Sequence, residues 1–488
     1  MEINKSIFRT YDIRGIVPDS LNEEVATLVG KAFATLMKNE GESTIIVGHD
    51  IRLTSENLNK ALISGIVSTG VNVIDIGLCV TPMSYFAREY LNIKPSIMIT
   101  ASHNPKEYNG FKICGLGKDT IFGEEVQDLR KFIEKGEFCK SDEPGKIETR
   151  DLKEAYINDI LNKVKLGDRK LKVAVDYGNG SASIFADSFF QNLGVEVLSV
   201  CDNPDGNFPN HHPDPSQEKN MIEFEKFIRE NNCDIGIAFD GDADRVIAFD
   251  ENGKILFGDE YAIVIWRDLL PKNPGAKVLL DVKCSQSLYE EAKKLGGVPE
   301  FCKVGSPLIK NEIRKQNLLF SAEYAGHVYF NDEHYGYDDA LYGAARILKI
   351  LSETDKKMSE LSSDAMIYQG SPEVIEKVTD ESKFDIVDKI KKEYIEKGFK
   401  VIDVDGARII FEDGWGLIRA SNTGPNLTIK AEATSKERCE EILNEIKNYI
   451  AKYKYTSNLL VKVEKKRGLL YRLFEFIFKR KKRSKLIK

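Results

Sequence analysis

The sequence predicts an α/β protein in which three successive similar domains, each with a mixed sheet flanked by helices, precede a C-terminal α+β domain and a basic amphipathic tail. Strand-like and helix-like patterns alternate through most of the 488 residues. Three successive blocks of this alternation each carry a polar loop after a strand-like run, and the pattern changes after about residue 365. A chain of this length also exceeds what one hydrophobic core usually serves, so several domains are expected.

Short apolar runs bounded by turn residues indicate the strands, and longer amphipathic runs indicate the helices. In the first block we expect strands at 43–48, 71–76 and 96–100 and helices at 22–38, 55–70 and 122–134. Further strands are expected at 171–177, 196–200, 234–239, 277–281, 297–304 and 318–322. The last block is expected to hold helices at 384–397 and 435–453 and strands at 408–412, 415–420 and 428–433. The predicted domains are 1–146, 147–251, 252–365 and 366–456, with the tail at 457–488.

The first polar loop, Thr100-Ala101-Ser102-His103-Asn104-Pro105, follows the apolar run 95–99. A serine at the mouth of a buried strand is available for chemistry. The glycine spacing of a nucleophile elbow is absent, so acyl transfer by a serine triad is not indicated. Taken alone, the loop also fits an ordinary turn of serine, asparagine and proline.

The second polar loop, Asp240-Gly241-Asp242-Ala243-Asp244-Arg245, places three carboxylates at alternate positions. Such charges repel one another without a cation, and Mg²⁺ prefers oxygen ligands of this kind. A calcium-binding EF-hand is excluded because Arg245 occupies the position that needs glycine and the preceding run is strand-like. A phosphatase that phosphorylates Asp240 and a plain acidic surface turn stay open as alternatives.

Two further loops add polar groups suited to a sugar phosphate. The run Arg419-Ala420-Ser421-Asn422-Thr423-Gly424 combines a guanidinium, hydroxyls, an amide and flexible backbone N–H groups, which is the composition of a phosphate cradle. The run Glu323-Tyr324-Ala325-Gly326-His327 supplies a carboxylate and an imidazole that suit vicinal sugar hydroxyls. Each alone would be an ordinary polar turn.

In this order the four loops resemble the α-D-phosphohexomutase family, most closely its phosphomannomutase/phosphoglucomutase branch. The resemblance runs from about residue 9 to about residue 449 and includes the opening run 9–15 and the connecting runs 205–215 and 281–284. It implies an intramolecular phosphotransferase that interconverts hexose 6-phosphate and hexose 1-phosphate, with mannose or glucose as the sugar. It also implies a phosphoserine, Mg²⁺ and a hexose 1,6-bisphosphate that is both intermediate and activator.

Other readings stay open beside this one. A mutase for glucosamine phosphate or another sugar phosphate would share the same loops. An aspartyl-phosphate phosphatase would carry its phosphoryl group on Asp240 rather than Ser102. A non-catalytic scaffold that binds sugar phosphates would show no interconversion.

The resemblance also implies roles for individual residues. The metal ligands would be Asp240, Asp242, Asp244 and the phosphate on Ser102. The catalytic residues would be Ser102, Lys112, His327, Arg14 and Arg245. The substrate would be bound by Tyr11, Lys283, Ser306, Glu323 and Ala325, and its non-reacting phosphate by Arg419, Ser421, Asn422 and Thr423.

These roles agree with the physics of phosphoryl transfer. Its loose transition state spreads negative charge over oxygens, so catalysis needs positioning and positive charge. Arg14, Lys112, Arg245 and Mg²⁺ would supply that charge. A general base must take the proton of the accepting hydroxyl. His327 fits that role on its intrinsic pKa, with Lys112 as the other candidate.

The sequence departs from the family pattern on the sugar side. Ala325 stands where the family has a serine, which removes a hydroxyl that would bind the sugar. Ser306 stands where many relatives carry a histidine. His49 replaces a common arginine in the run 48–52, which we interpret as structural. The identity of the hexose is therefore less defined than the phosphoryl chemistry.

Composition limits the classes of partner and the cellular compartment that the sequence suggests. Charged residues make up 30% of the chain and the net charge is −7, which does not suggest nucleic-acid binding. The eight cysteines form no C-x-x-C pair and no charged and apolar leader opens the sequence, so a cytoplasmic protein with reduced thiols is expected. His211 and His212 are expected in a connecting loop rather than as metal ligands.

The tail beyond residue 456 lies outside the resemblance. Residues 462–488 hold twelve Lys and Arg against two Glu, a net charge of +10, so the preceding residues carry −17 by difference from −7. The apolar run 469–478 is too short and too charged to span a bilayer. Followed by five basic residues, it could lie on an anionic membrane surface at the inner face of the membrane, or be a solvated tail or an oligomer contact.

Overall fold

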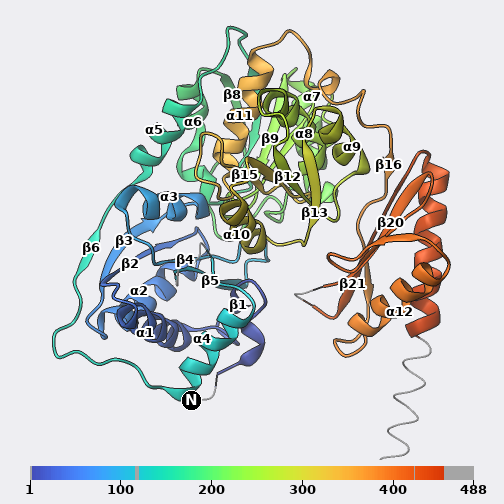
Figure 1. Cartoon of the computed structure of the whole chain (residues 1–488). Helices are drawn as coiled ribbons and strands as arrows, with labels where there is room; N and C mark the ends of the chain where they lie inside the picture. The colour runs from blue at the N-terminus through green and yellow to red at the C-terminus, as the bar shows by residue number, and fades with distance from the viewer. Residues whose placement is uncertain (1–2, 116–119, 422–423, 455–488) are drawn as a thin grey trace, which may run out of the picture. The chain divides into compact units, whose positions relative to one another are not determined.

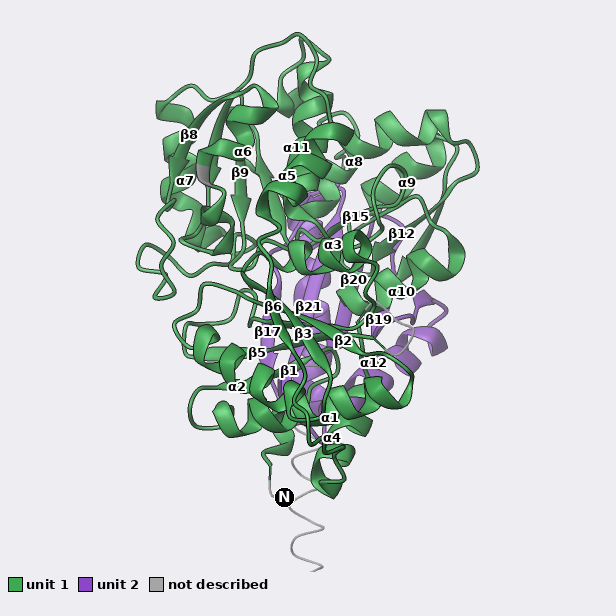
Figure 2. Ribbon diagram, turned by 90° about the vertical axis from the view of Figure 1, so that its left-hand side faces the viewer, with its two compact units in different colours: residues 1–367 green, residues 368–488 purple. Residues whose placement is uncertain are grey.

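A computed structural model describes residues 3–115, 120–421 and 424–454 of the chain. The chain forms two compact units, residues 1–367 and 368–488, shown in different colours in Figure 2. The predicted tail lies outside the described residues.

The first unit opens with a six-stranded mixed sheet in the order β1-β5-β4-β2-β3-β6 (Figure 1). Its strands are β1 (Ile13–Ile16), β2 (Thr44–His49), β3 (Asn72–Leu78), β4 (Ser96–Ile99), β5 (Tyr108–Cys114) and β6 (Ile147–Thr149). The accompanying helices are the 3₁₀ turn η1 (Lys5–Ile7), α1 (Glu23–Asn39), α2 (Ser55–Val67), α3 (Thr81–Leu91) and α4 (Glu124–Lys135).

Two further sheets follow in the same unit. The second has the order β11-β10-β9-β7-β8 and the third β13-β12-β14-β15. The second block comprises α5 (Lys153–Lys163), β7 (Lys172–Asp176), η2 (Ser181–Ile184), α6 (Ala186–Leu193), β8 (Glu196–Val200), α7 (Glu218–Glu230), β9 (Ile235–Phe239), β10 (Val246–Phe249) and β11 (Ile255–Leu256). The third comprises α8 (Gly258–Leu269), η3 (Leu270–Lys272), β12 (Lys277–Asp281), α9 (Gln286–Lys294), β13 (Val298–Cys302), α10 (Ser306–Gln316), β14 (Phe320–Ala322), β15 (Val328–Phe330), α11 (Ala340–Ser352) and η4 (Met358–Glu360).

One four-stranded pattern occurs in all three sheets. It reads β3-β2-β4-β5 in the first, β8-β7-β9-β10 in the second and β13-β12-β14-β15 in the third. In each, the first three strands along the chain are parallel and the fourth is antiparallel to the third. The predicted set of three similar α/β domains with mixed sheets is thus confirmed. The loop between the third and fourth strands, which begins at Thr100, Asp240 and Glu323, has the same place in each repeat.

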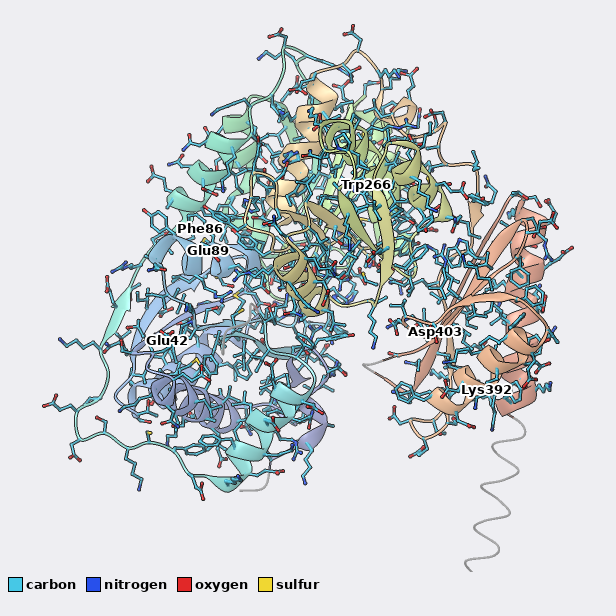
Figure 3. All side chains as sticks on the ribbon, viewed as in Figure 1. Glu42, Phe86, Glu89, Trp266, Lys392 and Asp403 are labelled. Atoms are coloured by element: carbon cyan, nitrogen blue, oxygen red, sulfur yellow. The ribbon has the colours of Figure 1, made fainter. Side chains whose placement is uncertain are left out.

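Alternate side chains of the buried strands face opposite helical layers. In β2, Ile45 and Val47 pack in one cluster with residues of α1, α2 and α4, whereas Ile46 packs in another with residues of α3. This is the two-residue period of a strand covered on both faces. The cluster that contains Ile46 also contains Val173 of β7 and Val278 of β12, so one apolar core joins the three sheets. Trp266 of α8, labelled in Figure 3, is fully buried in it.

Over its described residues, the second unit is an antiparallel sheet with two helices, which confirms the predicted α+β character. Its strands are β16 (Gln369–Gly370), β17 (Val374–Lys377), β18 (Lys400–Ile402), β19 (Ala407–Ile410), β20 (Gly414–Ala420) and β21 (Asn426–Ala433). The helices are α12 (Lys383–Glu396) and residues 436–454. Ile390, Ile429 and Ile446 share its core, so both helices pack on the sheet.

The domain limits stay predictions. The strand β6 begins one residue after the predicted boundary at 146 and pairs with β3 in the first sheet. The strands β1 and β5 form the other edge of that sheet and were not among the predicted elements. The sequence of β5 contains Asn109, Gly110 and Lys112, all buried, which breaks the expected apolar run.

Candidate active site

The equivalent loops of the first two repeats meet directly. Ser102 Oγ donates a hydrogen bond of 2.8 Å to Asp240 Oδ2. Thr100 Oγ1 donates to Asp242 Oδ2 at 3.0 Å, and the Thr81 backbone N–H donates to the Asp242 carbonyl at 2.9 Å. The predicted serine and aspartate clusters, 138 residues apart, therefore form one site.

Ser102 lies in a turn with a constrained backbone. Its φ is 50°, a left-handed conformation that non-glycine residues seldom adopt. Its N–H donates to Thr100 Oγ1 at 2.9 Å, and its Oγ lies 3.0 Å from His103 Nδ1. Burial and the nearby Arg245 and Arg14 lower the pKa of His103 well below its usual value, so this imidazole is neutral. The sequence did not indicate His103 as a site residue.

One buried arginine holds the loop that carries Ser102. The Arg52 guanidinium donates to four backbone carbonyls of this loop and the strand after it. The acceptors and distances are Ser102 at 2.7 Å, Asn104 at 2.7 Å, Pro105 at 2.7 Å and Tyr108 at 3.1 Å. Its Nε donates to Asp50 at 3.1 Å. Burial lowers the pKa of Arg52, and the adjacent Asp50 offsets part of that cost.

The three aspartates of the second loop are almost completely buried. The exposed fractions are 0% for Asp240, 0% for Asp242 and 2% for Asp244. Lys112 Nζ from β5 donates to Asp242 Oδ2 at 2.7 Å and to Asp244 Oδ2. Although burial favours the neutral acid, Lys112 and hydroxyl donors lower the pKa of Asp242 to about 2. Burial and the other two carboxylates raise the pKa of Asp240 well above its usual value. Burial and mutual repulsion thus oppose full ionisation of the three carboxyls when no cation is bound between them.

The donor set fits a hard divalent cation. One oxygen from each of Asp240, Asp242 and Asp244 can be chosen so that all lie within 4.8 Å of one another. Asp242 Oδ1 and Asp244 Oδ1 are buried and have no hydrogen-bond partner among the described residues. Buried carboxylate oxygens without partners are costly, and a cation that prefers oxygen ligands would remove that cost.

His327 of the third loop enters the same site. Arg245 Nε donates to His327 Nε2 at 3.0 Å, and His327 Nδ1 lies 3.1 Å from Asp338 Oδ2 and 3.7 Å from Asp244 Oδ1. Burial alone would lower the pKa of His327, but these carboxylates raise it. Asp338 is itself held by Lys310 Nζ at 3.0 Å and by the Ser306 hydroxyl. The sequence did not indicate Asp338 or Lys310.

The other residues that the sequence predicts to bind the sugar belong to the first and third repeats. Glu323 is 3% exposed, and its Oε1 accepts from Tyr329 OH at 3.1 Å. Lys283 Nζ lies 5.3 Å from the centre of the Tyr324 ring, and Ala325 is half-buried in the same loop. Tyr11 OH donates to the Val304 carbonyl at 2.8 Å, which ties the first repeat to the third. The Ser306 hydroxyl donates to Asp338 Oδ2.

Arg14 lies on β1 beside the Ser102 loop. Its guanidinium donates to Asn104 Oδ1 at 2.7 Å and to Asp12. Its Nε is buried and has no partner among the described residues. A buried donor of this kind can bind an anion that enters the site.

The predicted phosphate cradle lies in the second unit. Arg419, at the end of β20, donates from Nε and Nη2 to Asp405 Oδ2 at 3.1 and 2.9 Å. Lys383 Nζ donates to the Ser421 carbonyl at 2.8 Å and the Gly424 carbonyl at 3.2 Å. Asn422 and Thr423 lie outside the described residues. Lys383, which the sequence did not indicate, holds both ends of this loop.

Comparison with known proteins assigns the family. Four consecutive domains of one family, described as phosphoglucomutase/phosphomannomutase, alpha/beta/alpha domains I, II and III and C-terminal domain, match residues 5–140, 154–253, 257–367 and 373–448. The chain belongs to the phosphoglucomutase/phosphomannomutase family. The predicted resemblance is thus confirmed, and the Ser102, Asp240 and Glu323 loops lie within the matches to domains I, II and III respectively.

Individual members of the phosphoglucomutase/phosphomannomutase family are similar along most of their length. A phosphomannomutase/phosphoglucomutase of Pseudomonas syringae is 39% identical over 437 residues, 90% of this chain and 93% of the relative. A phosphoglucomutase of Neisseria meningitidis is 38% identical over 450 residues, 92% and 97% of the two chains. The crystal structure of a family protein from Burkholderia thailandensis matches with a TM-score of 0.86 and 34% identity, covering 93% of this chain and 98% of that one.

Proposed function

We propose that this protein interconverts hexose 6-phosphate and hexose 1-phosphate, with mannose or glucose as the sugar, through a phosphorylated Ser102. The observation that carries the proposal is the contact of Ser102 Oγ with Asp240, at 2.8 Å, inside a ring of cationic side chains. Lys112, Arg245 and Arg14 contribute that ring. A dianionic phosphate on Ser102 would be neutralised by these groups.

The reaction is a transfer in two halves. In the first, a hydroxyl oxygen of the hexose monophosphate bonds to phosphorus as the O–P bond of phosphorylated Ser102 breaks. The hydroxyl proton goes to a base, and Ser102 Oγ takes up a proton to become a hydroxyl. In the second, the hexose 1,6-bisphosphate has turned around, Ser102 Oγ gives up that proton and bonds to the phosphorus of the other phosphoryl group, the sugar O–P bond breaks, and the released sugar oxygen takes the proton held by the base. A free bisphosphate would reload an unphosphorylated Ser102, which is why it would activate the enzyme.

His327 is the better candidate for the base. Although burial favours neutral Lys112, the carboxylates of Asp242 and Asp244 raise the pKa of Lys112, so it keeps its proton. His327 accepts from Arg245 at Nε2 and presents Nδ1 to Asp338. In the proposed mechanism the substrate hydroxyl replaces Arg245 at Nε2, and Asp338 stabilises the imidazolium that forms.

The proposed Mg²⁺ ligands are Asp240, Asp242, Asp244 and the phosphate of Ser102. Bound there, the ion would neutralise charge on the transferring phosphoryl group. Glu323, Lys283, Tyr11, Ser306 and the backbone at Ala325 are proposed to bind the sugar. Arg419, Ser421, Asn422 and Thr423 are proposed to bind the phosphate that is not reacting.

A coupled assay tests the proposed function. Mannose, glucose and glucosamine 1-phosphates are each supplied with Mg²⁺ and a trace of the matching 1,6-bisphosphate, and formation of the 6-phosphate is followed. We expect turnover with mannose and glucose. Turnover with glucosamine phosphate alone would favour the other mutase, and binding without any turnover would favour a scaffold. Phosphate trapped on Asp240 would favour the phosphatase.

Asp244→Asn should weaken the metal site without unfolding it. An amide is a weaker ligand for Mg²⁺ than a carboxylate, so the Mg²⁺ concentration for half-maximal activity should rise by about 10- to 100-fold. Activity measured against Mg²⁺ after chelator treatment gives this value. The matched control is Asp250→Asn, because Asp250 is also buried but its Oδ1 accepts from the N–H groups of Asn252 and Lys254, which lie in its own turn. Equal metal dependence in both variants would contradict the assignment.

We also propose that residues 462–488 dock on an anionic membrane surface. The support is compositional: a net charge of +10 beside an apolar aromatic run. Among the described residues, none of the helices has the length and apolar character needed to cross a bilayer. The full chain should therefore sediment with vesicles containing anionic lipid at low salt, and a chain ending at Tyr455 should not. Equal sedimentation of the two would remove the proposal, as would binding that is indifferent to anionic lipid.

A further inference from the structure

A second group of potential metal ligands lies in the second repeat. Asp176 is the last residue of β7, Cys201 follows the adjacent parallel strand β8, and His211 lies in the connection that follows. One ligand atom from each can be chosen so that all lie within 4.8 Å of one another. None of the three is used by the proposed mutase mechanism.

The imidazole of His211 is oriented as a metal ligand would be. Its Nδ1 lies 2.9 Å from the His212 carbonyl oxygen. Because a carbonyl can only accept, Nδ1 carries the hydrogen, and a backbone carbonyl at the second nitrogen is a common partner of metal-bound histidine. In the neutral ring, Nε2 is then left with a lone pair.

That lone pair faces another acceptor. His211 Nε2 lies 3.1 Å from Asp176 Oδ2 and 3.3 Å from Oδ1. Two acceptors at this distance need a positive charge between them, either a proton or a metal ion. Burial alone would lower the pKa of His211, but hydrogen bonds with Asp176 and Cys201 raise it to about 11, so in the absence of an ion Nε2 holds a proton, which a metal ion must displace.

The donor set and its spacing suit Zn²⁺. Sulfur, nitrogen and carboxylate oxygen are its usual ligands, and bonds of about 2.0–2.1 Å in a tetrahedron separate the N and O ligands by about 3.3 Å. The observed separation of Nε2 and Oδ2 is 3.1 Å. Cys201 is a free, half-buried thiol, and the His211 side chain is 16% exposed, so an ion can enter. Three protein ligands leave a fourth position for water.

We propose that Asp176, Cys201 and His211 form a second metal site, selective for Zn²⁺ over Mg²⁺. This departs from the expectation from the sequence that His211 is not a metal ligand, because its partners are Asp176 and Cys201 rather than the adjacent His212. The oxygen-only cluster of Asp240, Asp242 and Asp244 would keep Mg²⁺, because a thiolate and an imidazole select softer ions. Binding would tie the loop containing His211 to the ends of two core strands. It should therefore raise the melting temperature of the whole chain.

Co²⁺ is the probe, because it replaces Zn²⁺ and reports a thiolate ligand through a near-ultraviolet charge-transfer band. The full chain is freed of metal, supplied with excess Mg²⁺ to occupy the aspartate cluster, and titrated with Co²⁺. We expect the band to appear at one equivalent and to disappear on adding Zn²⁺. Cys201→Ser should abolish it. Cys139→Ser is the matched control, another half-buried thiol of the first unit outside this group, and should leave the band unchanged.

His211→Gln separates loss of a ligand from loss of folding, because it keeps the thiol. Its affinity for Co²⁺ should fall by about 10- to 100-fold while the far-ultraviolet circular dichroism stays that of the wild type. Wild-type protein that gives no thiolate band would overturn the proposal and leave His211 as an imidazolium paired with Asp176. A band that persists in Cys201→Ser would overturn it as well.

Discussion

Ser102→Ala should abolish mutase turnover, lowering kcat at least ~1,000-fold, because it removes the atom proposed to carry the phosphoryl group. The protein should still fold. Ser102 Oγ makes its contacts with Asp240 and His103 only at the site, whereas the loop is held by Arg52 through backbone carbonyls that alanine retains. The coupled assay with glucose 1-phosphate and 1,6-bisphosphate measures the loss.

The matched control is Ser183→Ala. Ser183 Oγ is buried without a hydrogen-bond partner among the described residues, so its removal should leave turnover unchanged. Peptide mapping adds an independent readout: labelled bisphosphate should transfer its phosphoryl group to Ser102 in wild-type protein and in Ser183→Ala. A Ser102→Ala protein that kept full turnover, or label found on Asp240, would defeat the proposed carrier.

The parts of the site that could be predicted from sequence are those that lie together along the chain. Asp240, Asp242 and Asp244 follow one strand within five residues, and Ser102 follows another, so each loop is recognisable by itself. Their convergence follows from the repeated strand order, in which the same connection carries each loop. The alternation of strands and helices makes this repetition predictable, although the predicted strands do not include the antiparallel fourth strand of any repeat, β5, β10 or β15.

The parts that could not be predicted depend on contacts between distant segments. Arg52 donates to backbone carbonyls about fifty residues further along the chain. Asp338 lies beside His327 because a β-bridge pairs Asp338 with Tyr329 of β15. Neither residue carries a local pattern, since an arginine after a strand and an aspartate before a helix are common. The sequence indicates a structural role for the run 48–52, which fits the contacts of Arg52, but it does not show that Arg52 donates to the carbonyl of Ser102 itself.

Arg52→Met should both destabilise the protein and slow the reaction. The change leaves Asp50 buried without its cation and removes the donor from four carbonyls. Breaking a buried ion pair on one side typically costs ~3–5 kcal/mol in the free energy of unfolding. The Ser102 turn, with its φ of 50°, should then relax, and a displacement of about 1 Å can lower kcat ~100-fold.

Two further variants separate positioning from stability. Arg346→Met is the matched control, because Arg346 is also buried and paired, with Asp332 at 2.7 Å, but lies apart from the Ser102 loop. It should lose stability while the folded protein keeps its kcat. Arg52→Lys retains the charge but not the planar fork, so it should recover stability more than kcat. Because Arg52 touches backbone rather than substrate, KM should change little in either Arg52 variant. If folded Arg52→Met showed wild-type kcat in denaturant-free buffer, the backbone of the loop would be self-supporting, and Arg52 would serve only the stability of the first sheet.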